Sequence, residues 1–145
     1  MTQEDKALLL KDLCARLPYD TVCQVEFKSD GRYESKNMIL SGIFKDEAYF
    51  TIENGSVYSN DYKPYLFPLS SLTEEQRNNI SKLLIDTQNE FSPYGEINMK
   101  GCDNLFICSV KQSNALINYC LTNHLDINSL IKRGLAIDAT GLNIY

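Results

Sequence analysis

The chain has 145 residues, of which 43% are hydrophobic and 23% are charged, so it can bury a core without disulfides or a metal. This length predicts one compact domain, residues 1–145. The formal net charge of -5 opposes long-range attraction to a phosphate backbone or an anionic membrane surface. Composition therefore disfavours nucleic acid and membranes as partners, with a local basic face for nucleic acid kept as an alternative.

The cysteines and the apolar runs bear on the compartment. The five cysteines are an odd number and no two have the C-x-x-C spacing, so neither a disulfide framework nor a zinc site is expected. The polar start lacks the pattern of a signal peptide, and no apolar run has the length of a membrane span. The sequence predicts a cytoplasmic protein with mostly buried free thiols and no cofactor.

A first helix is predicted over residues 3–16. Thr2 and Asp5 have the spacing of a capping box, in which each side chain caps a free N–H of the other residue. Apolar residues then recur on one helical face. Pro18 ends the helix, because a proline pushes the residue before it out of the α region.

Four or five short strands are predicted next, from alternating apolar and polar residues separated by turn signals. They cover residues 22–28, 37–44, 47–53 and 56–59, with a short fifth candidate at 65–69. The polar residues 29–36 predict an exposed loop. Gly42, inside the second strand, predicts a bulge or a bend.

The chain changes character at residues 63–76. Two prolines there fix φ and remove backbone donors, so the segment is expected at a sheet edge or in an extended connector. Thr73 and Gln76 repeat the capping-box spacing and predict a helix over residues 74–89. The segment, here called the joint, is therefore predicted to connect the β-rich residues 1–72 with the mainly helical residues 73–145.

Residues behind this joint are predicted to be mainly helical. The expected elements are a short strand at 105–110, a helix at 113–123 and a last short helix from Asp126 to Gly134. The expected fold class is α+β: an N-terminal helix, a small, strongly bent antiparallel sheet, and a mostly helical C-terminal half. A barrel of the SH3-like or Sm-like kind is one way to close such a sheet. The sub-regions are residues 1–72 and 73–145.

One group of residues could carry nucleophilic chemistry. His124 is the only histidine, Cys120 lies four residues before it, and Asp126 could orient the ring, as a cysteine nucleophile requires. A histidine at the end of a helix is also favoured by the helix dipole without any catalytic role. Adjacent acids occur only where turns and helix starts are expected, and no phosphate-binding glycine loop occurs. We therefore predict no catalytic residue, with an enzyme based on Cys120 or a carboxylate as an alternative.

Tyrosines crowd the middle of the chain. The candidate interaction surface consists of Tyr49, Tyr58, Tyr62 and Tyr65. Tyrosine suits contact surfaces because it has a rigid apolar body and a polar tip. Tyr49 must point outward if Ala48, Phe50 and Ile52 face inward. The alternative is that the second half of the chain covers these tyrosines as core. The expected partner is another protein or a second copy, with no small molecule implied.

Residues 63–75 read K-P-Y-L-F-P-L-S-S-L-T-E-E. This run resembles a family of small uncharacterised proteins of gut anaerobes and their phages and mobile elements, with the pattern K-P-Y-L-x-P-[LM]-S-S-[LM]-T-E-E. Residues 12–19 and 124–136 also resemble the corresponding segments of this family, whereas residues 32–41 and 98–114 differ from it. The resemblance implies a phage or mobile-element accessory protein, a class that commonly binds other proteins. We expect a non-enzymatic protein-interaction domain, with an enzyme or a nucleic-acid accessory factor as alternatives.

Overall fold

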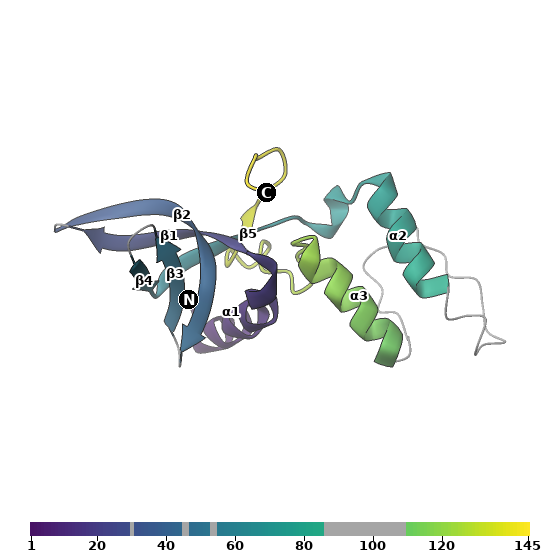
Figure 1. Ribbon diagram of the computed structural model, residues 1–145, viewed down its shortest axis with the longest axis horizontal. Coiled ribbons are helices and arrows are strands. Elements are labelled where there is room, and N and C mark those ends of the chain that lie inside the picture. The colour runs from purple at the N-terminus through teal and green to yellow at the C-terminus, as the bar shows by residue number, and fades with distance from the viewer. Residues whose placement is uncertain (30, 45–46, 53–54, 86–109) are drawn as a thin grey trace.

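Figure 1 shows a computed structural model of the chain, which describes residues 1–29, 31–44, 47–52, 55–85 and 110–145. A helix packs on an open sheet, and two short helices lie side by side away from that sheet. The elements in chain order are α1 (Gln3–Arg16), a 3-10 helix (Leu17–Tyr19), β1 (Val22–Ser29), β2 (Arg32–Phe44), β3 (Glu47–Ile52), β4 (Gly55–Ser59), β5 (Asp61–Leu66), a second 3-10 helix (Leu69–Ser71), α2 (Glu74–Ile85), α3 (Val110–Thr122) and β6 (Ile137–Asp138). None of the described helices has the length and apolar run needed to cross a bilayer.

The helix α1 begins and ends where the sequence predicts. Thr2 Oγ1 accepts a hydrogen bond from the N–H of Asp5 at 3.1 Å, and the Asp5 carboxylate accepts one from the N–H of Thr2 at 3.4 Å. Pro18 lies in the 3-10 helix that follows. Asp20 then adopts a left-handed conformation with φ 48°, which turns the chain into β1. The capping box is therefore confirmed.

The sheet has the strand order β4-β3-β2-β1-β5-β6 and is not closed. Its first five strands pair antiparallel, whereas β5 and β6 pair in parallel through Tyr65 and Leu66. The prediction of a purely antiparallel sheet, and of a barrel as its closure, was wrong. The reason is non-local: β5 pairs with β1, the C-terminal β6 attaches to β5, and β4 stays at the opposite end of the strand order.

The strand β2 corrects a second prediction. Within the polar stretch 29–36, expected as a loop, Ser29 ends β1 and residues 32–36 begin β2, in a β-hairpin whose register runs out to Ser29 opposite Arg32. They are polar because the outer part of this hairpin extends beyond the core, so their composition reflects exposure and not the absence of a strand. The bend predicted at Gly42 is confirmed, since the β2–β3 register shifts between Leu40 and Gly42.

The joint at residues 63–76 is part strand and part connector. Pro64 lies inside β5 opposite Cys23 and is fully buried, while β6 pairs only with the two residues after it. The ladder on that side therefore begins beyond the proline, which has no N–H to donate. Thr73 and Gln76 form the predicted reciprocal cap of α2, with hydrogen bonds of 3.0 and 3.1 Å.

A mostly helical C-terminal half is not supported. Beyond residue 73 the described chain has two short helices, and the predicted last helix from Asp126 is a turn. The Asp126 carboxylate accepts hydrogen bonds from the N–H groups of Leu130 and Ile131, and Ser129 has φ 56°, which a continuous helix does not allow. The predicted strand at 105–110 and the end of the predicted helix at 74–89 fall on residues 86–109, outside the described residues; Val110 already belongs to α3.

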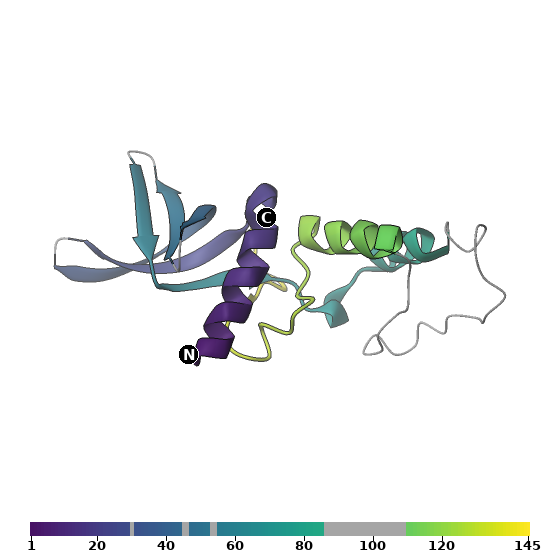
Figure 2. The ribbon, with the colours of Figure 1, turned by 90° about the horizontal axis from the view of Figure 1, so that it is seen from below.

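The main core lies between α1 and the inner face of the sheet (Figure 2). Alternate strand residues point into it, as the period of a half-buried strand requires. Its least exposed members include Leu9, Leu13, Cys23, Val25, Leu40, Ala48, Phe50 and Leu66. A second, smaller cluster around Leu72, Cys120 and Leu125 joins the helical pair to the rest.

A buried ion pair links α1 to the turn after α3. Arg16 Nε donates to Asp12 Oδ2 at 2.5 Å, and both side chains are fully buried. Arg16 Nη2 also donates to the carbonyl of Leu125 at 2.7 Å, and Asn128 Nδ2 donates to Asp12 Oδ1 at 2.7 Å. Two segments more than 100 residues apart thus bind the same charge pair, and Arg16 Nη1 is its one polar atom that is buried without a hydrogen-bond partner among the described residues.

We expect Asp12→Ala to lower the free energy of unfolding by about 3–5 kcal/mol, because it leaves the Arg16 charge buried without a counter-ion. The double variant Asp12→Leu/Arg16→Met should lose less, since it buries no charge. Urea denaturation of both variants measures the difference. A double variant less stable than Asp12→Ala would contradict this account of the pair.

Candidate functional site

The four candidate tyrosines do not share one surface. Tyr62 is 7% exposed and packs on Phe50 with ring centroids 5.6 Å apart. Tyr65 is 6% exposed, and its hydroxyl donates to Asn37 Oδ1 at 3.0 Å. Both therefore belong to the interior; their partners Phe50 and Asn37 lie in strands of the sheet, whereas the alternative expected the second half of the chain to cover the tyrosines.

Tyr49 and Tyr58 lie on the outer face of the sheet. They are directly opposite each other in the β3–β4 register, and their rings meet edge to face with centroids 5.5 Å apart. Ala48 and Phe50 are fully buried, so the predicted outward direction of Tyr49 is confirmed; the Ile52 side chain falls outside the described side chains. Tyr58 is 64% exposed and belongs to a surface that a partner could contact.

Tyr58 stands on a strand with an open edge. The strand β4 ends the strand order, so one side of it pairs with β3 and the other has no strand partner within the described residues. A depression of about 550 Å³ lies along it, here called the β4 groove. Its lining comprises Glu26, Phe27, Lys28 and Tyr33 from the β1–β2 hairpin and Ser56 to Asp61 from β4 and the start of β5.

The β1–β2 hairpin forms the opposite wall of the β4 groove. Because β5 pairs with β1 only from Cys23 to Glu26, no strand among the described residues pairs with the outer part of β1 on the groove side. Tyr33, directly opposite Lys28 in the hairpin, is 81% exposed. In Figure 2 the hairpins β1–β2 and β3–β4 extend in different directions from the base of the sheet. The groove is therefore the gap that an unclosed sheet leaves.

One end of the β4 groove is closed by Ser59. Its hydroxyl donates to the carbonyl of Glu26 at 2.6 Å and accepts from the N–H of Asp61 at 2.9 Å. These bonds join the end of β4 to β1 and fix the bend at Asn60 through which the chain enters β5. The groove is thus anchored at the end where β4 meets β1.

The alternative catalytic group does not assemble. His124 has φ 54° and follows α3, where its N–H donates to Leu121 O and the N–H of Leu125 donates to Cys120 O, the bonding pattern of a Schellman cap. Its imidazole stacks on Tyr145 with centroids 3.7 Å apart. The Asp126 carboxylate is occupied by two backbone N–H groups and does not orient the ring.

The pKa shifts of Cys120 and His124 also do not suit a nucleophile and its base. Burial raises the pKa of the Cys120 thiol, which disfavours the thiolate that a nucleophile needs. Burial, and then the nearby Arg16 guanidinium, lowers the pKa of His124 to about 4, so the imidazole is neutral near pH 7 and adds no charge to the helix dipole. Its Nδ1 is buried without a hydrogen-bond partner among the described residues. The histidine is therefore a packed cap residue.

No group of three or more metal-ligating side chains gathers in the part of the chain that the structure describes. Comparison with known proteins gives no match to any protein-family model, curated protein or solved structure. The family resemblance of residues 63–75 stays a prediction. The β4 groove therefore rests on its own geometry.

The split among the tyrosines predicts unequal costs of substitution. Tyr62→Ala should lower the free energy of unfolding by about 3–5 kcal/mol, because it empties a core position. Tyr58→Ala should cost about 1 kcal/mol, mainly the edge-to-face contact with Tyr49. Urea denaturation compares the two, and equal losses would show that the buried and exposed assignments are wrong.

Protonation of His124 is expected to lower the stability of the folded chain at acid pH. Because the pKa of His124 is lower in the folded chain than its usual value of 6.5, the unfolded chain binds the proton more tightly. Stability from this group should fall as the pH drops from about 6.5 to about 4 and change no further below that. His124→Asn tolerates the left-handed backbone and does not titrate. The test is urea midpoints against pH, and identical slopes for both proteins would refute it.

Proposed function

We propose that this protein is a non-enzymatic protein-interaction domain that binds an extended segment of another protein along β4. The observation that carries the proposal is an open strand edge inside a groove flanked by two exposed tyrosines, Tyr33 and Tyr58. Strand addition draws affinity from backbone hydrogen bonds and specificity from side chains on either side of the strand. Exposed tyrosines are the usual anchors of such contacts.

The free edge supplies the backbone groups. Gly55 pairs with Ile52 across a two-residue connection, and alternate residues of an antiparallel ladder point their N–H and C=O to opposite sides. By that alternation Ser56 and Tyr58 direct theirs away from β3. The five residues of β4 extend over about 17 Å, which suits a partner segment of similar length.

A single chain fits the groove better than a second folded copy. The edge of another sheet carries its own neighbouring strand and its own hairpin, and the β1–β2 hairpin stands across from β4 (Figure 2). An extended segment has no such bulk. Self-association through β4 is thus the weaker form of the interaction, and light scattering distinguishes it as a mass twice that of the chain.

The proposal includes a cytoplasmic setting and an accessory role of the phage or mobile-element kind. Free thiols at Cys14, Cys23 and Cys120 support a reducing compartment. The accessory role has the resemblance of residues 63–75 as its support. Neither is needed for strand addition at β4.

Peptide selection tests the function. A displayed library of randomised nine-residue peptides is selected on the immobilised full chain, and binders are measured by fluorescence anisotropy. Ser56→Pro removes an outward N–H from an edge strand, where proline is tolerated, and Tyr58→Ser removes the exposed ring. We expect each to weaken binding at least tenfold, a loss of about 1.4 kcal/mol or more.

Ile117→Ser is the matched control, because Ile117 is 43% exposed on α3, away from the sheet (Figure 1). It should leave affinity within twofold, and melting curves check that each variant is folded. In the wild-type protein, peptide should also slow hydrogen exchange at the N–H groups of Ser56 and Tyr58. A selection without binders, or binders that ignore both β4 variants, contradicts the proposed function.

A further inference from the structure

Two carboxylates face each other at the closed end of the β4 groove. Glu26 of β1 and Asp61 of β5 are directly opposite in the antiparallel register, and both are exposed. Residues so placed have Cβ atoms about 5 Å apart, and like charges there repel. Both residues line the groove. The free protein therefore places two negative charges directly opposite each other where a strand added to β4 would end.

Two lysines lie near this pair without forming an ion pair with it. Lys28 is two residues further along β1, opposite Tyr33, and Lys63 is two residues further along β5, opposite Gln24. Neither forms an ion pair with Glu26 or Asp61; the exposed ion pairs among the described residues are Lys36–Glu34 and Arg133–Asp5. Diagonal neighbours in a sheet lie about 7–8 Å apart, within reach of a long side chain, so a basic side chain of a partner competes with these lysines for the two carboxylates.

The backbone at this end is already fixed. The Ser59 hydroxyl holds the Glu26 carbonyl and the Asp61 N–H, and the two carboxylate groups accept no hydrogen bond from a described residue. Asp61 also lines a second depression, of about 620 Å³, that continues past Asn60 toward the start of α1. A long side chain of a partner thus has room to reach the two carboxylates.

We propose that the segment bound along β4 carries an arginine or lysine side chain that docks between Glu26 and Asp61. The inference rests on the proposed function and adds the chemistry of the partner. A cation there removes the repulsion between the two carboxylates and forms charge-assisted hydrogen bonds. The net charge of -5 speeds the approach of a basic segment over an acidic one. Lys28, further along the groove, disfavours a uniformly basic segment.

The selected peptides test this proposal. Peptides chosen on the full wild-type chain should be enriched in arginine or lysine at one position, and their affinity should fall as salt is raised from 50 to about 500 mM. The variant Glu26→Gln/Asp61→Asn should weaken these peptides about tenfold. It should also raise the Tm of the free protein, because the repulsion is removed.

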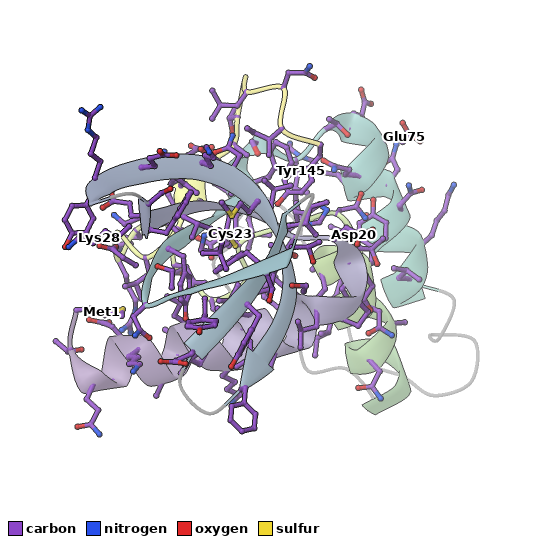
Figure 3. All side chains as sticks on the ribbon, turned by 60° about the vertical axis from the view of Figure 1, so that its left-hand side comes forward. Met1, Asp20, Cys23, Lys28, Glu75 and Tyr145 are labelled. Carbon is purple, nitrogen blue, oxygen red and sulfur yellow. The ribbon has the colours of Figure 1, made fainter. Side chains whose placement is uncertain are left out.

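Glu4→Gln/Glu75→Gln is the matched control. It changes the net charge by the same two units, from -5 to -3, at residues that do not line the groove; Figure 3 shows Glu75 on the opposite side of the view from Lys28. Affinity should stay within twofold. Binders that Ser56→Pro abolishes but that lack an enriched basic position, or that bind the Glu26/Asp61 variant equally well, overturn this inference and leave the proposed function standing. Binders unaffected by Ser56→Pro, or no binders at all, overturn both.

Discussion

The buried pair of Asp12 and Arg16 is the constraint on which the rest of the molecule depends. A charge pair without solvent depends on further hydrogen bonds to its remaining polar groups. Here the carbonyl of Leu125 and the amide of Asn128 supply two such bonds, so the turn after α3 must sit against α1, while Arg16 Nη1 is buried without a partner among the described residues. The same turn closes α3, and Tyr145 stacks on it while donating its hydroxyl to the carbonyl of Tyr65 in β5. One electrostatic requirement thus joins helix, sheet and chain end.

The open sheet connects this scaffold to the proposed function. Proteins usually protect a free strand edge with charges, bulges or a covering segment. Here the β1–β2 hairpin stands across from β4, and the register shift at Gly42 bends the strands between them. Such an edge is shielded from a second sheet but open to a single extended chain. Absence of closure is then a useful property, because a closed barrel would have no backbone groups left to offer a partner.

The tyrosines show how one residue type takes opposite roles over a few positions. Tyr58 and Tyr62 are separated by the bend at Asn60, which moves the chain from β4 at the edge to β5 beside β1. Tyr58 stays in solvent, whereas Tyr62 lies against Phe50. The sequence predicted all four tyrosines as one interaction surface, but only Tyr49 and Tyr58 lie on the outside of the sheet. Tyr33, an exposed aromatic residue across the groove, was missed because residues 29–36 were predicted as a loop; only the hairpin register of the structure places it opposite Lys28.

The sequence alone determined the elements that depend on near neighbours. Capping boxes at Thr2 and Thr73 and the glycine bend at position 42 follow from contacts within a few residues, so local patterns predicted them. Only the tertiary structure decided which strand stays unpaired, that β6 joins in parallel, and that Asp126 caps a turn and not a helix. These depend on pairings between residues far apart in the chain, and the exposed polar residues of β2 are compatible with loop or strand until such a pairing is known.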